Sequence, residues 1–255
     1  MNQALLYLTL YKVFVICDTK TSTERYPSGS RGWFAKSLGG RKFPRGFESL
    51  PLRQINCGTF VKIPIMKRVF IIHGWSGSPR SDWLPWLAGG LRADEFQVTV
   101  PEMPNNDTPK IDEWVPFLSD LIGKADKDTY FVGHSIGCQT ILRYLEGLDE
   151  DVRVGGIVFV APWFHLRNLS GEEEEKIAEP WIKTPIDFSK VKSHCRDFIA
   201  IFSDNDPFVP LTDKELFEKN LGAKTTVLNN LGHMSTEDGV LKLQEAYAAI
   251  TSLVD

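Results

Sequence analysis

Short apolar runs separated by longer amphipathic segments recur along the chain from residue 69 onward. The runs lie at 69–72, 96–100, 129–132, 156–160, 198–202 and 225–228. The run at 69–72, Val-Phe-Ile-Ile, shows none of the alternation expected of a half-exposed strand. Continuous apolar sequences of this kind are typical of parallel strands that are covered on both faces. The pattern predicts a mostly parallel sheet.

The segments between these runs carry helical patterns. One helix is expected to be capped by Ser81 or Asp82 and to end near Leu91, and the last is expected over 240–253. Apolar residues at helical spacing predict another helix within 110–124: Ile111, Trp114, Val115, Leu118, Leu121 and Ile122. Strands that alternate with helices predict a compact, doubly wound α/β domain, with helices on both faces and a short polar insertion at 163–193.

Charge divides the chain into two parts that the average conceals. The whole chain of 255 residues has a net charge of −4, but residues 1–65 hold ten lysines and arginines against three acidic residues, a net charge of +7. The remaining residues therefore hold 19 basic and 30 acidic side chains, a net charge of −11. The sequence accordingly predicts two regions, a basic leader at 1–65 and the α/β domain at 66–255.

The leader is expected to be irregular, because residues 21–58 lack periodicity and are dense in Gly, Ser, Arg and Pro. One interpretation is a disordered basic segment. A second is a misassigned start, because the sequence at 46–49, Gly-Phe-Glu-Ser, resembles a translation of the T-arm consensus of transfer-RNA genes. Met66 lies just before the first convincing strand, where a start codon would be expected.

Candidate chemistry is concentrated around a Gly-x-Ser-x-Gly motif. Gly133, Ser135 and Gly137 lie between an apolar run and a predicted helix. This is the context of a nucleophile elbow, in which a strained turn exposes the serine hydroxyl and small neighbours avoid a collision. The motif and its position together predict that Ser135 is a nucleophile in an α/β-hydrolase fold.

A serine hydroxyl needs a general base, and in this fold class the order along the chain is serine, acid, histidine. His233 follows the last predicted strand, whereas His165 and His194 lie in or beside the insertion and are expected to have no catalytic role. The acid is expected in the loop after the strand at 198–202. Asp206, fixed by an Asp-Pro-x-x-Pro sequence, is the first choice and Asp204 the alternative.

An oxyanion hole needs two preorganised N–H groups. The backbone of Ile136, directly after the nucleophile, is expected to supply one, and the backbone of Trp75, after the first strand, the other. His134 is expected to pack or hydrogen-bond beneath the serine, and Cys138 to be a small helix residue rather than a nucleophile.

Composition limits the function classes. An acidic balance argues against a nucleic-acid partner, and no apolar stretch approaches the roughly 18 residues of a membrane span. Four widely spaced cysteines without a C-x-x-C pair suit a reducing compartment, and a cytoplasmic protein is expected. No metal or organic cofactor is implied, and the sequence does not indicate an oligomeric state.

Several motifs together resemble a known family. They are His73-Gly74-Trp75-x-Gly77-Ser78-Pro79, Trp83-Leu84-Pro85-Trp86-Leu87, Gly133-His134-Ser135-Ile136-Gly137, Pro180-Trp181, Phe188, the segment from Asp204 to Pro210, and Gly232-His233. In this order they resemble the small serine hydrolases of the retinoblastoma-binding protein 9 type, including the bacterial YdeN group. The resemblance covers the chain from Met66 onward and implies a compact α/β-hydrolase fold, with Ser135, Asp206 and His233 as its triad.

Three functions are open from the sequence. The leading hypothesis is hydrolysis of a carboxylic ester, thioester or amide through an acyl-serine intermediate, with a small molecule or a short peptide as substrate. The same triad could transfer the acyl group to another acceptor. A binding protein that retains only the fold is the third hypothesis, and the three triad positions argue against it.

Overall fold

The computed structural model describes residues 5–8, 11–14, 61–63 and 66–254. The chain divides into two compact units, Met1–Ile65 and Met66–Asp255. In the first unit, β1 (Leu5–Leu8), β2 (Tyr11–Phe14) and β3 (Val61–Ile63) form an antiparallel sheet in that order. These short strands were not expected from the sequence. The irregular stretch expected at 21–58 lies outside the described residues.

The second unit is built on a six-stranded sheet in which every neighbouring pair is parallel. Its order is β5-β4-β6-β7-β8-β9. The strands are β4 (Arg68–Ile72), β5 (Gln97–Thr99), β6 (Thr129–His134), β7 (Gly156–Val160), β8 (Phe198–Ser203) and β9 (Lys224–Leu228). The reversal of order after β5 is typical of doubly wound sheets, and it brings β4 beside β6.

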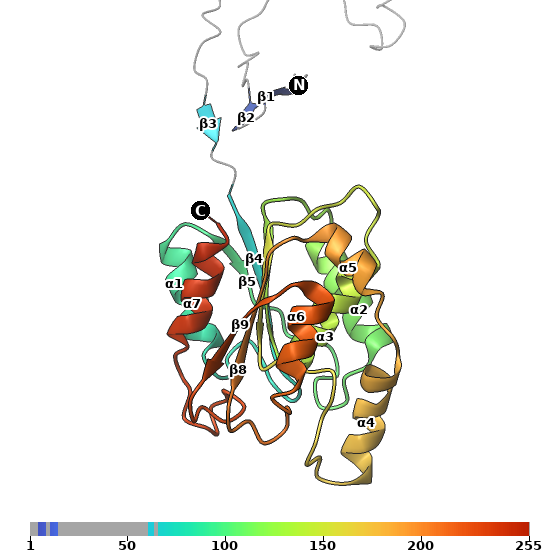
Figure 1. Ribbon diagram of the computed structural model, residues 1–255. Helices are drawn as coiled ribbons and strands as arrows, with labels where there is room; N and C mark the ends of the chain where they lie inside the picture. The colour runs from blue at the N-terminus through green and yellow to red at the C-terminus, as the bar shows by residue number, and fades with distance from the viewer. Residues whose placement is uncertain (1–4, 9–10, 15–60, 64–65, 255) are drawn as a thin grey trace, which may run out of the picture. The chain divides into compact units, whose positions relative to one another are not determined.

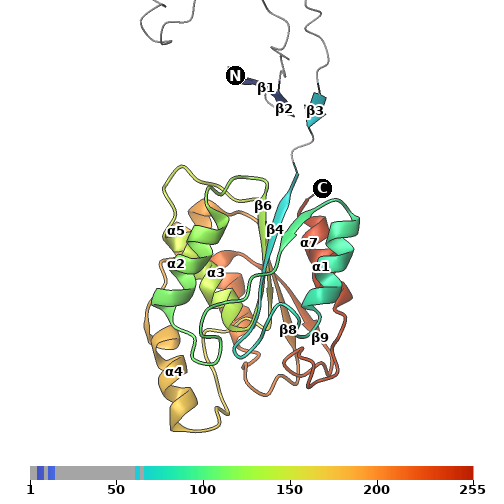
Figure 2. The same ribbon diagram turned by 180° about the vertical axis from the view of Figure 1, so that it is seen from behind.

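Helices cover both faces of this sheet (Figures 1 and 2). The helices are α1 (Leu84–Ala93), α2 (Ile111–Ile122), α3 (Ile136–Glu146), α4 (Glu172–Lys183), α5 (Phe188–His194), α6 (Asp213–Leu221) and α7 (Gln244–Ser252). One face is covered by α1 and α7, and the opposite face by α2, α3, α5 and α6. The prediction of a doubly wound α/β domain, the α/β-hydrolase class, is confirmed.

The two cores follow from the alternation of side chains along each strand. In β6, Phe131 packs in the core beneath α2 and α3, whereas Tyr130 and Val132 pack in the core beneath α1 and α7. All six residues of β6 are buried. Because both faces are covered, the strand has no polar side to display, which explains its continuous apolar sequence.

Three details differ from the sequence prediction. Helix α1 begins at Leu84 without a side-chain cap, since Ser81 accepts a hydrogen bond from Ser78 N and Asp82 bonds to Thr236. Helix α7 begins at Gln244 rather than near residue 240. The segment 163–193 is not wholly an insertion, because α5 packs on α3 through Val191, which is fully buried, and so belongs to the main helical layer.

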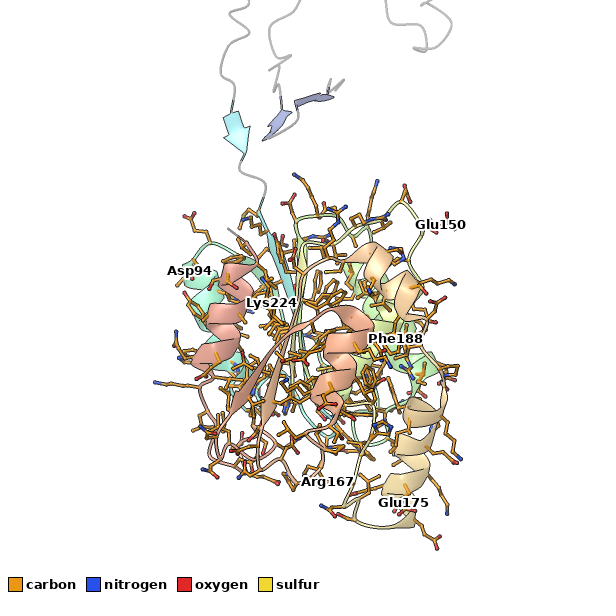
Figure 3. The ribbon with its side chains drawn as sticks, in the orientation of Figure 1. Asp94, Glu150, Arg167, Glu175, Phe188 and Lys224 are labelled. Carbon is orange, nitrogen blue, oxygen red and sulfur yellow. The ribbon has the colours of Figure 1, made fainter. Side chains whose placement is uncertain are left out.

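Because the strands are parallel, the loops that follow them meet at one edge of the sheet, where ligands of such folds bind. Figure 3 shows Arg167, in the loop after β7, near this edge, while Lys224 at the start of β9 lies toward the opposite one. Among the described residues, no helix is long and apolar enough to cross a membrane.

Candidate active site

Ser135 occupies a sharp turn between β6 and α3. Its φ of 51° and ψ of −117° lie outside the regions that side-chain-bearing residues normally adopt. A Cβ on Gly133 would lie 2.8 Å from Cys138 N, and one on Gly137 would lie 2.9 Å from His73 O and closer still to Ile72 O. The two glycines therefore let α3 approach β6 and β4 closely enough for the turn to form. Ser135 itself is 8% exposed.

His233 and Asp206 are joined by a hydrogen bond across two loops. The distance from His233 Nδ1 to Asp206 Oδ2 is 2.8 Å. The other carboxylate oxygen, Oδ1, accepts the backbone N–H groups of Phe208 at 2.9 Å and Val209 at 3.0 Å. Asp206 is 2% exposed. Both of its carboxylate oxygens accept hydrogen bonds, as burial of a charge requires. Since the carboxylate only accepts, Nδ1 of His233 carries a proton, and Nε2 makes no hydrogen bond to any described residue.

The alternative acid, Asp204, has a different contact. Its Oδ1 accepts the backbone N–H of Asn230 at 2.8 Å, and in the described part of the chain it makes no hydrogen bond or ion pair with His233. Asn205 adds a second link, because its Oδ1 accepts Gly232 N at 2.8 Å. Of the two candidate acids, the fold brings Asp206 to the imidazole, and Asp204 joins the two loops.

The imidazole of His233 lies beside the elbow. Its ring centroid is 5.2 Å from that of His134, the residue before Ser135, and Phe208 packs edge-on against it at 5.3 Å. In the described part of the chain, no hydrogen bond joins the Ser135 hydroxyl to His233. Such contacts are often long in ligand-free active sites and shorten when substrate binds.

The loop after β4 faces Ser135. A Cβ on Gly74 would lie 3.6 Å from Ser135 Cβ, so the peptide that leads to Trp75 runs past the serine. Among the described residues, neither Trp75 N nor Ile136 N donates a hydrogen bond to another backbone group. The indole N–H of Trp75 is bound to Asp107 O at 3.0 Å, which holds the loop in place.

His73 supports this loop and was not singled out as a functional residue from the sequence. It is fully buried, accepts Met103 N on Nε2 at 3.0 Å and lies 2.7 Å from Gly74 O through Nδ1. Burial lowers its pKa, which favours the neutral form with the proton on Nδ1. A histidine directly after an apolar strand was the signal that could have identified it.

The side chains of the remaining candidates have partners other than Ser135, Asp206 and His233. The exposed ring of His165 is hydrogen-bonded to the buried carboxylate of Asp213 at 2.7 Å, and Nδ1 of His194 lies 3.0 Å from Val152 O. Cys138 is fully buried and burial raises the pKa of its thiol, so it is unsuited to nucleophilic attack. Within the described ranges, no cluster of three His, Cys, Asp or Glu side chains could hold a metal ion.

Three surface cavities lie away from Ser135, His233 and Asp206. One of about 510 Å³ lies between α1 and α7, one of about 640 Å³ between α4 and the loop at 166–169, and one of about 500 Å³ beside α5. The second touches the active-site loops indirectly, because Arg167 in its lining donates to Asp206 O at 2.6 Å.

A nucleophile elbow at the carboxyl end of a doubly wound sheet, beside a histidine–aspartate pair, defines the class of α/β-hydrolases. The profile of the family described as "Serine hydrolase" matches residues 69–252. The chain belongs to this serine hydrolase family and is a hydrolase.

Relatives agree with this assignment. The putative hydrolase YdeN of Bacillus subtilis is 29% identical over 186 residues, which cover 73% of this chain and 95% of YdeN. The serine hydrolase RBBP9 of Rattus norvegicus is 27% identical over 167 residues, 65% of this chain and 81% of RBBP9. The crystal structure of the ydeN gene product superposes with a TM-score of 0.68 at 28% identity, over 74% of this chain and 99% of that one.

Proposed function

We propose that this protein hydrolyses a carboxylic ester, thioester or amide through an acyl-Ser135 intermediate, with His233 as general base and Asp206 as the residue that orients it. The observation that carries the proposal is the 2.8 Å hydrogen bond between Asp206 and His233, formed beside the strained backbone of Ser135. Removal of any member of such a triad abolishes most of its catalysis.

The positions of these groups support the following chemistry. Ser135 Oγ attacks the carbonyl carbon of the substrate while its proton moves to the free Nε2 of His233. The tetrahedral intermediate collapses, the bond to the leaving group breaks, and His233 gives that group the proton. Water then repeats the sequence on the acyl-serine and releases the carboxylic acid. Asp206 stabilises the imidazolium that forms in each half-reaction.

The negative charge on the tetrahedral oxygen needs donors that are already in place. Ile136 N lies at the start of α3, where backbone N–H groups have no partner within the helix, and Trp75 N lies on the loop that faces Ser135. We assign the oxyanion hole to these two groups. One donor of this kind contributes about 2.7–4 kcal/mol to the lowering of the barrier.

The substrate is proposed to be a small molecule or a short peptide. The part of the 163–193 segment that lies outside the main helical layer consists of one loop and α4, a helix of 12 residues. This is a small cover compared with what a bulky lipid needs to be shielded from water. The loop is fixed to the acid loop by Arg167 N and Phe208 O at 2.9 Å and by Asn168 Nδ2 and Pro207 O at 2.7 Å.

The experiment follows p-nitrophenol release from p-nitrophenyl acetate, butyrate and octanoate with the full chain and with its Ser135→Ala variant. A burst equal to the enzyme concentration, absent in the variant, is expected if an acyl-serine accumulates. Preference for the shorter chains is expected for a small substrate. Equal rates for both proteins would contradict the proposal, and an ester product formed in added methanol at the expense of acid would favour acyl transfer.

A further inference from the structure

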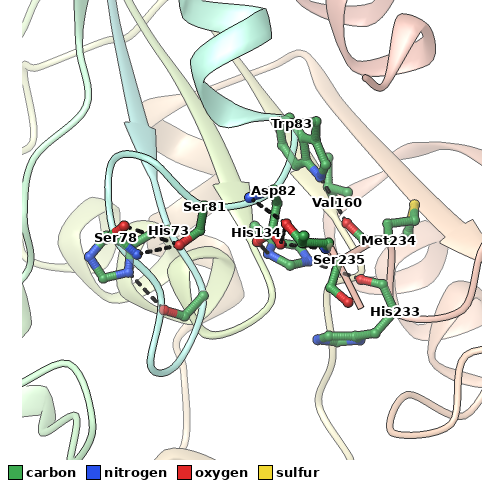
Figure 4. Close-up of polar contacts among 12 residues, drawn as sticks. His73, Ser78, Ser81, Asp82, Trp83, His134, Val160, His233, Met234 and Ser235 are labelled. Atoms are coloured by element: carbon green, nitrogen blue, oxygen red, sulfur yellow. Dashed lines mark hydrogen bonds and ion pairs between the residues drawn. The ribbon is translucent and has the colours of Figure 1, made fainter. Parts of the chain in front are cut away.

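His134 contacts the main chain of the proposed base. It is the last residue of β6 and is 3% exposed, and its Nε2 lies 2.9 Å from the backbone oxygen of His233 (Figure 4). A carbonyl oxygen can only accept, so Nε2 carries the proton and donates it. His134 and the nucleophile Ser135 are consecutive, and the strand end that carries the nucleophile thus also holds the base.

A second residue, Asp82, lies on the other side of the His134 ring. Its Oδ2 is 3.5 Å from His134 Nδ1, and this nitrogen is buried without a hydrogen-bond partner in the described part of the chain. Oδ1 of Asp82 accepts Thr236 N at 2.7 Å and Thr236 Oγ1 at 3.0 Å. The φ of Asp82 is 56°, a left-handed conformation that is strained for a residue with a side chain and persists only when its surroundings enforce it.

Trp83 completes the contact from the same loop. Its Nε1 donates to Met234 O at 3.0 Å, and its ring meets that of His134 edge-on with centroids 5.8 Å apart. Trp83 is fully buried. The indole therefore supports His134 and the histidine loop at the same time.

These contacts fix consecutive peptide groups of the loop that carries the base. The His233 carbonyl is held by His134, its N–H is held by Asp238 Oδ2 at 2.8 Å, the Met234 carbonyl by Trp83, and Thr236 by Asp82. The partners of the His233 carbonyl, the Met234 carbonyl and Thr236 come from positions 99, 151 and 154 residues away in the chain. A loop fixed at this many points cannot shift without breaking several hydrogen bonds, including the buried one from Trp83 to Met234 O.

We propose that His134 is a positioning residue, supported by Asp82 and Trp83, which holds the backbone of His233 so that its free Nε2 faces Ser135. The inference rests on the proposed function. It links nucleophile and base through a single peptide bond and a single hydrogen bond. A displacement of about 1 Å between reacting groups costs about a hundredfold in rate, so a residue that keeps His233 in place preserves the rate of the reaction.

Charge agrees with this role. Burial, and secondarily the positive charge that His233 can acquire, lower the pKa of His134 to about 4, while Asp82, Asp206 and the His233 carbonyl act in the opposite direction. His134 is therefore neutral at pH 7. Because its side chain is neutral, His134 does not oppose the formation of an imidazolium on His233 during catalysis.

Two amide variants of the full chain separate the hydrogen bond from the bulk of the side chain. In His134→Gln the amide nitrogen takes the place of Nε2 and can reach the His233 carbonyl. In His134→Asn it takes the place of Nδ1, close to Asp82, and cannot. The readouts are the second-order rate of labelling by a fluorophosphonate, the Tm, and the low-field proton resonance of the His233 Nδ1–H group.

We expect His134→Gln to be labelled within about threefold of the wild-type rate and to keep the resonance, and His134→Asn to be labelled about 30-fold more slowly with a shifted resonance, at similar Tm. Equal rates in both variants, whether unchanged or equally slow, would overturn the proposal. If both variants fail to fold, Trp83→Phe decides, because it removes the donor to Met234 O and keeps an aromatic ring at this position. Slower labelling supports the proposal and an unchanged rate overturns it. Wild-type protein that is not labelled would instead refute the proposed function, and the inference with it.

Discussion

Asp206 holds His233 through one carboxylate oxygen while its other oxygen is held by the backbone of its own loop. Oδ2 lies 2.8 Å from His233 Nδ1, and Oδ1 accepts the N–H groups of Phe208 and Val209. This division fixes which oxygen faces the imidazole, and because that oxygen only accepts, Nδ1 of His233 carries the proton. The second acid of the loop, Asp204, is engaged by Asn230 N and provides a matched control.

Asp206→Asn is predicted to lower the rate of ester cleavage by about 10³–10⁴-fold with little loss of stability. The asparagine oxygen can still accept the two backbone N–H groups, so its NH₂ must face His233. That reverses the tautomer and leaves a proton on Nε2, which then cannot accept one from Ser135. Steady-state kinetics with p-nitrophenyl acetate measure the effect. In Asp204→Asn the rate is expected to stay within about tenfold, and a greater loss there than in Asp206→Asn would reverse the assignment.

Gly137→Ala is predicted to destabilise the protein by about 1–3 kcal/mol or more, because the added Cβ meets the backbone oxygens of Ile72 and His73. Gly89→Ala in α1 is the control. A Cβ there meets nothing within 4 Å, and alanine is the better helix former, so a gain of about 0.5–1 kcal/mol is expected. Urea unfolding measures both variants. Comparable changes in the two would show that crowding at the elbow is not what excludes a side chain.

The lowered pKa of His134 predicts a specific dependence of stability on pH. In the unfolded chain this imidazole takes up a proton near pH 6.5, whereas in the folded chain it does so only near pH 4. Its contribution is therefore fully present above pH 6.5 and is lost as the pH falls toward 4. Between pH 7 and pH 5, wild-type protein is expected to lose about 2 kcal/mol more than His134→Gln. Parallel losses in the two proteins, measured by urea unfolding at both pH values, would contradict the shift.

Arg143→Met is predicted to cost about 2 kcal/mol of stability. The buried guanidinium donates to Trp181 O at 2.8 Å, to Thr184 O at 2.9 Å and to Gln139 Oε1 at 2.8 Å, and it thereby satisfies the carbonyls at the end of α4. Burial lowers its pKa to about 10, so it remains charged at pH 7. Arg92→Met, which removes an exposed contact to Val98 O, is expected to change stability by no more than about 0.5 kcal/mol. Thermal unfolding compares them, and equal effects would refute the prediction.

The strands could be predicted from the sequence because they are buried on both faces. The runs at 69–72, 129–132, 156–160 and 198–202 have no solvent-facing side, and all four became central strands. The four glutamates that begin α4 could be interpreted from the sequence as a solvated helix face, whereas α5, with only seven residues, was missed. The place of α5 in the main helical layer depends on the packing of Val191 against α3, which no local sequence pattern indicates.

The candidate site, too, could be predicted from the sequence only in part. Order along the chain and loop chemistry were enough to nominate Ser135, Asp206 and His233, because each follows a strand that could be located. The support of the site could not be found this way. Asp82 and Thr236 are 154 residues apart, and the role of His73 depends on Met103, so only the fold brings these partners together.

Labelling of the full chain with a fluorophosphonate, followed by peptide mass spectrometry, tests the central claim most directly. The account predicts one adduct per molecule, located on Ser135, lost in Ser135→Ala and formed much more slowly in His233→Gln, while Cys138→Ser is labelled normally. Folded protein that forms no adduct, or an adduct on another serine that survives in Ser135→Ala, would contradict the assignment of the nucleophile.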